Sequence, residues 1–271
     1  MPGTAWNILA CVKNANEQII NSYFMAQIWL YTFGSLFVVS LLSFVGALTL
    51  ALGSERLKKT LLYLVSFSAG ALLGDVFLHL FPEMQASGFG AREGFYILAG
   101  IFAFFVFEKY IHWHHSHMEH QEEIHAVVYL TIAGDALHNF IDGLVIAGSF
   151  LVSLPLGIAT ALAVIFHEIP HELGNFAVLV HGGWTAKKAL LYNFLSSFAA
   201  FFGGLVVLLF SRELSSAPSI LLSVGASNFI YVALSDLIPE LNKEVDKKKS
   251  FFLLVTFVLG IAMMALLLLH E

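Results

Sequence analysis

Long apolar stretches separated by short charged segments dominate this chain of 271 residues and limit what it can fold into. Hydrophobic residues make up 58% of the chain and the mean hydropathy is +0.82. A helix that crosses a bilayer needs about 20 predominantly apolar residues. By this measure we expect eight spans, at residues 28–52, 60–82, 94–111, 127–150, 156–181, 187–211, 219–241 and 250–270. The prediction is an all-α, multi-pass integral membrane protein.

The distribution of Lys and Arg predicts the orientation, because short cytoplasmic loops retain these residues. Most of the 13 basic residues fall in alternate loops: Arg56, Lys58, Lys59, Lys109, Lys187, Lys188, Lys243, Lys247, Lys248 and Lys249. The segments expected on the other side of the membrane contain Lys13, Arg92 and Arg212. We therefore expect both termini to be extracytoplasmic and the plasma (inner) membrane to be the location. Residues 1–27 form a short outer segment in this scheme, and residues 28–271 form a single eight-helix domain.

Two neighbouring spans carry the same polar pattern at positions i, i+1 and i+4. The six residues are His138, Asn139 and Asp142 in HNFIDG, and His167, Glu168 and His171 in HEIPHE. On a helix, the first and last side chains of each set share one face. An ionisable side chain at mid-depth in the bilayer costs roughly 2.5–3.5 kcal/mol on insertion scales. Several such groups so close together need a compensating partner, and a cation is the one that we expect.

The ligand types indicate which cation. They are imidazole, carboxylate and amide groups, and the single cysteine, Cys11, lies in the N-terminal segment. Such a set suits Zn²⁺, Fe²⁺, Mn²⁺ or Cd²⁺ better than copper(I). We expect zinc first, with no organic cofactor. We also expect no nucleic-acid partner.

Pro170 lies inside the second motif and has no backbone N–H. The carbonyl of Phe166, one turn earlier, is therefore freed and the helix bends. Within a membrane, a freed carbonyl survives only where it faces protein, water or an ion.

Spans two and seven end alike, in His79-Leu80-Phe81-Pro82-Glu83 and Asp236-Leu237-Ile238-Pro239-Glu240. Spans four and five also share a pattern while running in opposite directions. A 3+2+3 inverted-repeat arrangement would explain both similarities, and such repeats place transport sites near the midplane of the membrane.

Further polar residues could line a path through the bilayer. They are Asp75, His79, Glu83, Asp135, Glu172, Asn193, Asp236 and Glu240. In the expected orientation, Glu83 lies nearest the outer mouth, while Asp236 and Glu240 lie at the cytoplasmic end. For Glu83 and Glu240, an ordinary helix-terminal carboxylate explains the residue nearly as well.

The expected cytoplasmic loop at residues 112–125 is rich in histidine. It contains His112, His114, His115, His117, His120 and His125. His-rich tracts are typical of metal binding. We expect this loop to collect or sense the ion and to lie outside the essential path, although a merely solvated polar loop is the simpler alternative.

The segments HNFIDG and HEIPHELGNFAVLVHGG resemble the fourth and fifth helices of the Zrt/Irt-like (ZIP) metal transporters, in the subfamily with HEIPHE. SAGALLGDVFLHLFPE and ALSDLIPEL extend the resemblance to spans two and seven. The resemblance implies eight spans with both termini outside, movement of divalent metal into the cytoplasm, and a metal site formed by the six motif residues above. Small residues along the spans would also permit a homodimer.

The chain departs from the family pattern at two places. Some members have a carboxylate on helix six that completes a second metal position, whereas residues 187–211 offer Asn193, Ser196 and Ser197. The subfamily often has an acid where this chain has Asn175. One metal position is therefore expected, and the lost charge could broaden the metal preference.

The segment HEIPH also matches HExxH, in which two histidines bind zinc and a glutamate acts as general base. An intramembrane zinc metalloprotease using residues 167–171 is the alternative to a transporter. Pro170 between the histidines and the companion motif on the neighbouring span favour transport over enzymatic activity. A metal-sensing receptor without flux is a third reading.

Overall fold

The computed structural model describes residue 23 and residues 25–47, 54–86, 88–115, 120–214 and 218–270. These residues are almost entirely helical and contain no β-strand, so the predicted all-α class is confirmed for them. Most of the expected N-terminal segment 1–27, with Cys11, lies outside the described residues, as does His117.

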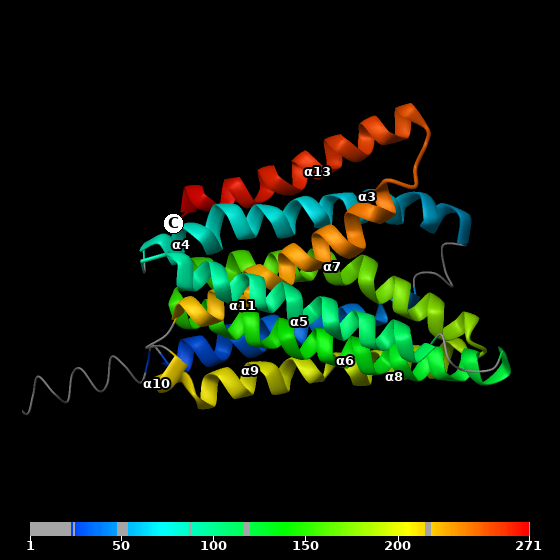
Figure 1. The fold of residues 1–271 in the computed structure, drawn as a ribbon, viewed down its shortest axis with the longest axis horizontal. Helices are drawn as coiled ribbons and strands as arrows, with labels where there is room; N and C mark the ends of the chain where they lie inside the picture. The colour runs from blue at the N-terminus through cyan, green and yellow to red at the C-terminus, as the bar shows by residue number, and fades with distance from the viewer. Residues whose placement is uncertain are drawn as a thin grey trace, which may run out of the picture.

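A first span runs through Met25–Gly46 and ends in the 3₁₀ turn η1 (Ser43–Gly46). The main helices that follow are α3 (Ser54–Asp75), α5 (Ala91–His115), α6 (His120–Val152), α7 (Leu154–His181), α8 (Ala186–Ser197), α9 (Ala199–Leu209), α11 (Pro218–Tyr231) and α13 (Lys247–Leu267). Shorter elements are η2 (Val76–Leu80), α4 (Phe81–Ala86), α10 (Ser211–Leu214), η3 (Val232–Leu237), α12 (Ile238–Leu241) and η4 (Leu268–His270). In Figure 1 the long helices lie side by side along the long axis, with α13 at one edge next to α3 and the pair α8 and α9 at the opposite edge.

Seven helical segments of the described chain are long and apolar enough to cross a membrane. The expected span at 94–111 is not among these seven. It lies within α5, a continuous helix of 25 residues with charged residues near both ends. The segment expected at 187–211 is divided at Phe198 into α8 and α9.

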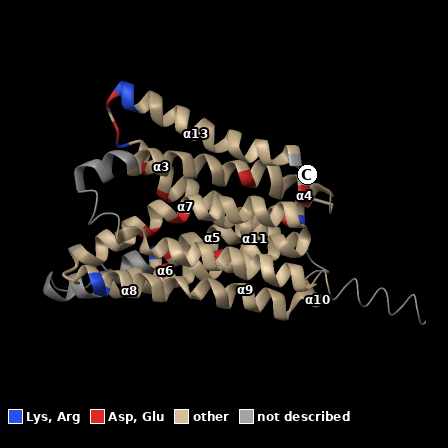
Figure 2. Cartoon of the chain, turned by 180° about the vertical axis from the view of Figure 1, so that it is seen from behind, with Lys and Arg blue, Asp and Glu red and all other residues tan. Residues whose placement is uncertain are grey.

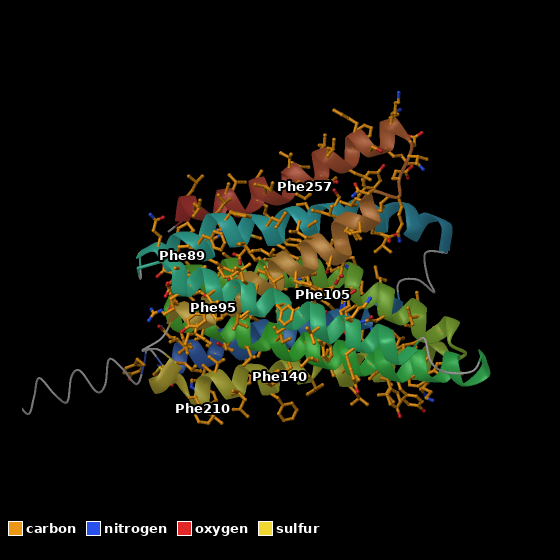
Figure 3. The ribbon with its side chains drawn as sticks, viewed as in Figure 1. Phe89, Phe95, Phe105, Phe140, Phe210 and Phe257 are labelled. Carbon is orange, nitrogen blue, oxygen red and sulfur yellow. The ribbon has the colours of Figure 1, made fainter. Side chains whose placement is uncertain are left out.

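The outer surface of the bundle is apolar, as a lipid-facing surface must be. Large side chains such as Phe95 (67% exposed), Phe105 and Phe210 point away from the helices (Figure 3). The basic starts of α8 and α13 lie at the same end of the bundle, whereas Asp and Glu also occur along the middle of several helices (Figure 2). The chain is an integral, multi-pass membrane protein.

The similar endings of spans two and seven fold alike. Each has a π-helical segment, η2 or η3, directly before the Pro-Glu pair at Pro82 or Pro239. A π-turn widens the helix where a following proline cannot donate its usual hydrogen bond. This shared distortion supports the pairing of the two spans, while the complete 3+2+3 arrangement stays a prediction.

The histidine-rich segment differs from the loop expected at 112–125. Helix α5 continues to His115 and α6 begins at His120, so only residues 116–119 lie between them. The segment contains neither proline nor glycine to end a helix. His112, His114 and His115 therefore belong to the end of α5, while His120 and His125 belong to the start of α6, and their side chains lie outside the described part.

Helix α6 lies against α9 at very short range. A side-chain carbon on Gly203 would collide with the backbone carbonyl of Phe140, and one on Gly143 would collide with that of Ala200. Glycine at such points lets membrane helices approach closely. On its other side α6 packs against α7, which begins at the N-cap Ser153, and the two motifs face each other there.

Candidate metal centre

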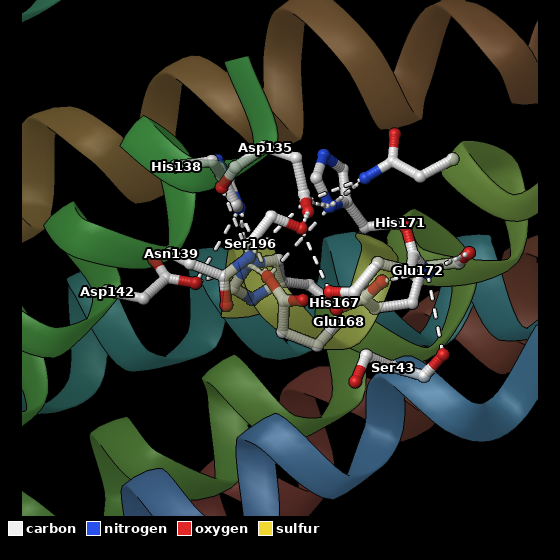
Figure 4. A network of polar contacts seen from close by, with 12 residues as sticks. Ser43, Asp135, His138, Asn139, Asp142, His167, Glu168, His171, Glu172 and Ser196 are labelled. Carbon is white, nitrogen blue, oxygen red and sulfur yellow. Dashed lines mark hydrogen bonds and ion pairs between the residues drawn. The ribbon is translucent and has the colours of Figure 1, made fainter. Parts of the chain in front are cut away.

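Four ligand-type side chains converge between α6 and α7. His138 and Asp142 come from α6, while His167 and Glu168 come from α7 (Figure 4). One ligand atom from each residue lies within 4.8 Å of all the others. Asp142, His167 and Glu168 are buried, and the side chain of His138 is 15% exposed. We call these four residues the metal cage.

The separations between the ligand atoms fit one small ion. The two Nε2 atoms of His138 and His167 lie 3.1 Å apart. Asp142 Oδ2 lies 3.6 Å from His138 Nε2 and 3.3 Å from His167 Nε2. Glu168 Oε1 lies 3.2 Å and 3.3 Å from the same two nitrogens. A regular tetrahedron with edges of this length has its centre about 2.0 Å from each corner, which is the length of Zn–N and Zn–O bonds.

Neighbouring groups orient two of the ligands. The Nδ1 atom of His167 lies 3.3 Å from the carbonyl oxygen of Ala163. With a proton on Nδ1, this ring donates to that carbonyl and turns an unprotonated Nε2 into the cage. Asn228 of α11 donates to Oδ1 of Asp142 at 3.1 Å, which leaves Oδ2 for the ion. Oδ2 of Asp142 and both carboxylate oxygens of Glu168 are buried and accept no hydrogen bond from the described residues.

Asn139 and His171, the other two motif residues, lie beside the cage rather than in it. The ring of His171 stacks on that of His138, with centroids 4.4 Å apart, and its Nδ1 is 4.0 Å from Glu168 Oε1. Asn139 donates to the backbone carbonyl of Asp135 at 3.1 Å, while its own Oδ1 is buried and accepts no hydrogen bond from the described part of the chain. His171 thus contacts two of the four cage residues, whereas the amide of Asn139 is bonded to Asp135.

Asp135 is the centre of a second polar group next to the cage. Asn175 donates to its Oδ1 at 2.7 Å, and Ser196 donates to its Oδ2. The Nδ1 atom of His171 lies 3.5 Å from the same carboxylate. An acid at position 175 would repel Asp135, so the amide at this departure from the family pattern fits its surroundings.

Asn193 contacts Glu172 and not the metal cage. Its amide donates to one carboxylate oxygen of Glu172 and, at 3.3 Å, to the backbone carbonyl of the same residue. The other oxygen of Glu172, Oε1, is buried and has no hydrogen-bond partner among the described residues. Asn193 and Ser196 of α8 thus contact Glu172 and Asp135, and the place of Asn193 in a transport path stays a prediction.

A cavity of about 420 Å³ opens beside the cage. His138, His171 and Asp135 line its inner part, and Glu108 and Asp236 line it further along α5 and η3. The hydroxyl of Tyr231, also in the lining, donates to Glu108. Asp236 is exposed, and Ser235 donates to it at 2.7 Å. The cage thus adjoins a cavity with a largely apolar lining that also contains the carboxylates of Glu108 and Asp236.

The candidates in span two lie toward the other end of α7. Asp75 and His79 are buried, 3.4 Å apart between Oδ1 and Nδ1, and Thr160 donates to Asp75 at 3.2 Å. His79 and Glu83 line a separate cavity of about 340 Å³, together with Ser153 at the start of α7. Glu240 is exposed and pairs with Lys243 at 2.5 Å, away from both cavities.

Sequence patterns alone did not identify Asn228, Glu108 or Tyr231 as residues near the site. Asn228 is buried in an apolar span, and a buried amide there indicates a polar contact with a neighbouring helix. Glu108 and Tyr231 carry no such signal, because each lies near a helix end where polar residues are common.

A multi-pass membrane protein that brings two imidazoles and two carboxylates together between neighbouring spans belongs to the class of membrane metal-binding proteins. The model of the ZIP zinc transporter family matches residues 26–127 and 112–268. The chain belongs to this family.

Curated relatives agree with the family assignment. Zinc transporter ZIP13 of Pongo abelii is 33% identical over 75% of this chain and 65% of its own length. Zinc transporter zipt-7.2 of Caenorhabditis elegans is 30% identical over 90% of this chain and 66% of its own length. Zinc transporter ZIP4 of Homo sapiens is 30% identical over 68% of this chain and 39% of its own length. The chain therefore spans less than two thirds of the length of these relatives.

Proposed function

We propose that this protein moves divalent metal, zinc first and Fe²⁺, Mn²⁺ or Cd²⁺ with lower preference, across the membrane into the cytoplasm. The observation that carries the proposal is the metal cage, in which five ligand separations of 3.1–3.6 Å match one tetrahedral zinc ion. The names of the relatives, all zinc transporters, support the same cargo.

The surroundings of the cage favour passage over permanent storage. A structural zinc site is closed, with four fixed ligands. Here His171 adjoins the cage, and a cavity lined in part by His138 and His171 opens beside it. A transported ion must bind strongly enough to lose its bound water, and it must still be able to leave. Ligands that can be exchanged for one another meet both requirements. The six motif residues thus act together, with four holding the ion at a time.

The two cavities and the basic residues support an inward direction of travel. The cavity with His79 and Glu83 receives the ion from outside, and the cavity with Asp236 and Glu108 releases it at the end where the basic starts of α8 and α13 lie. Basic residues mark the cytoplasmic side. This assignment places both termini outside. The plasma membrane as location and a homodimer remain parts of the same proposal.

Uptake and proteolysis can be separated with one preparation. Purified protein in sealed vesicles is expected to load zinc into the lumen and to leave unfolded or membrane-spanning peptides uncut. In the protease reading, Glu168 would act as a base on water, whereas its Oε1 lies at ligand distance from both cage imidazoles. Peptide cleavage that requires zinc and Glu168, in vesicles that take up no metal, would overturn the proposal.

Acidification is expected to weaken zinc binding, because imidazole must be neutral to bind a metal. Two imidazoles of the cage compete with protons for the ion, so zinc affinity should fall at least about tenfold from pH 7.5 to 5.5. Zinc titrations of detergent-purified protein in buffers across this range measure the effect. Equal affinity at both ends of the range would contradict ligation by His138 and His167.

The histidines between α5 and α6 are expected to influence regulation more than basal flux. Replacing all six (His112, His114, His115, His117, His120 and His125) by glutamine keeps the helices and removes the imidazoles. We expect basal zinc uptake into vesicles to stay within about twofold of the unaltered protein, because none of these residues belongs to the cage. Complete loss of uptake by a well-folded variant would put the segment in the essential path.

A further inference from the structure

The backbone of α7 lacks one internal hydrogen bond directly before the cage residues. Pro170 has no N–H, so the carbonyl of Phe166 receives no bond from the usual donor four residues later. This carbonyl lies inside the bundle, where an unpaired backbone group is costly. The hydroxyl of Ser68 on α3 fills the gap, with its Oγ 2.6 Å from the carbonyl oxygen of Phe166. Ser68 is 1% exposed.

A second contact flanks this hydrogen bond. The rings of Phe67 and Phe166 meet edge to face, with their centroids 4.9 Å apart. Helix α3 therefore contacts α7 at Phe166 in two ways. The hydroxyl of Ser68 binds the carbonyl that the proline leaves without a donor, and the ring of Phe67 packs against the ring of Phe166. Phe166 directly precedes His167 and Glu168, so this contact fixes the backbone of half of the metal cage.

Ser68 has a second acceptor within reach. Its Oγ also lies 2.7 Å from the carbonyl of Leu64, one turn earlier in its own helix. A serine hydroxyl has one proton to donate. If α7 moves away from α3, the hydroxyl can keep a partner in Leu64. The hydrogen bond to Phe166 can therefore break without leaving the hydroxyl of Ser68 unpaired.

Ser66, which lies two residues before Ser68 on α3, provides a comparison. Its hydroxyl donates to the carbonyl of Leu253 on α13, also at 2.6 Å, and it is also buried. Leu253, however, is followed four residues later by Phe257, which has an N–H of its own. Both serines join α3 to a neighbouring helix. Of the two, Ser68 donates to a carbonyl that lacks its usual amide donor within the helix.

We propose that Ser68 is a positioning residue of the metal site, whose hydroxyl replaces the amide donor that Pro170 lacks and holds α7 at Phe166 so that His167 and Glu168 reach the cage. The proposal rests on the proposed function, because it assigns a role in the same metal site. Without the hydroxyl, α7 relaxes around Phe166 and the two ligands shift away from His138 and Asp142.

The test compares Ser68→Ala, Ser68→Thr and Ser66→Ala in the full-length protein, with zinc affinity and the KM and maximal rate of vesicle uptake as readouts. We expect Ser68→Ala to weaken zinc binding about tenfold, as loss of a group that orients a metal ligand does. Ser68→Thr keeps the hydroxyl and should restore the affinity. Ser66→Ala removes an equal interhelical bond and should bind zinc as the unaltered protein does.

A second test adds Ser68→Ala to a variant in which Pro170 has been replaced. Pro170→Ala supplies an N–H for the carbonyl of Phe166, so Ser68→Ala should cause no further loss of affinity when added to Pro170→Ala. Equal affinities for Ser68→Ala and Ser66→Ala, or a full tenfold loss in the Pro170→Ala background, would overturn the role of Ser68. Zinc binding without uptake by the unaltered protein would instead overturn transport and leave the affinity comparison valid, while absence of zinc binding would contradict both.

Discussion

His167→Ala is expected to abolish zinc uptake and to weaken zinc binding more than about 100-fold, because loss of even a supporting partner outside the ligand set costs 10–100-fold. His167 is 1% exposed, and its Nε2 lies within 3.3 Å of the ligand atoms of His138, Asp142 and Glu168. Radioactive zinc uptake into vesicles, with zinc titration of the purified protein, measures both effects.

Two further variants test whether the loss is specific to His167. Thr256→Ala on α13 removes a hydroxyl that bonds only to carbonyls of its own helix, and it should insert and transport normally. His171→Ala removes the imidazole beside the cage and should weaken binding less than His167→Ala does, because His171 is not one of the four close ligands. Normal uptake by His167→Ala, at normal expression, would refute the assignment of this histidine.

Gly203→Val is expected to prevent stable folding. The added side chain would meet the backbone carbonyl of Phe140 on α6, and a carbonyl cannot turn aside as a flexible side chain can. Overpacking of a core usually costs about 1–3 kcal/mol, and we expect this case to reach or exceed the upper end. Because α6 carries His138 and Asp142, the same change should also disrupt the metal cage. Thermal unfolding in detergent and zinc titration together measure the loss.

Gly34→Val provides the matched control for that variant. Gly34 also lies in a membrane-spanning helix, but it is exposed, and a side-chain carbon placed there meets nothing within 4 Å. This variant should unfold close to the temperature of the unaltered protein. If both variants unfold alike, valine in a helix is the cause, and the close approach of α6 and α9 is not.

The helices and the central site follow from the sequence because they rest on local patterns. Apolar length predicts the spans, and the i, i+4 spacing of His138 with Asp142 places this pair on one face of a helix. The missing backbone donor at Pro170 is predictable for the same reason. Membership of the ZIP family, indicated by HNFIDG and HEIPHE, is confirmed by the family match.

The partners from distant helices could not be predicted, because nothing local specifies them. Asn228 on Asp142, Ser196 on Asp135 and Ser68 on Phe166 join residues that are far apart in the chain. The separation of His171 from the cage is another example, since its spacing from His167 alone would include it. Small rotations of α7 against α6 decide which of its ligand-type side chains enter the cage.

The most direct test of the central claim is X-ray absorption at the zinc edge of the zinc-loaded protein. The cage predicts four nitrogen and oxygen ligands at about 2.0 Å, two of them imidazoles, with one imidazole lost in His138→Ala. A spectrum with no imidazole scattering, or one unchanged by His138→Ala, would show that α6 and α7 do not hold the ion together.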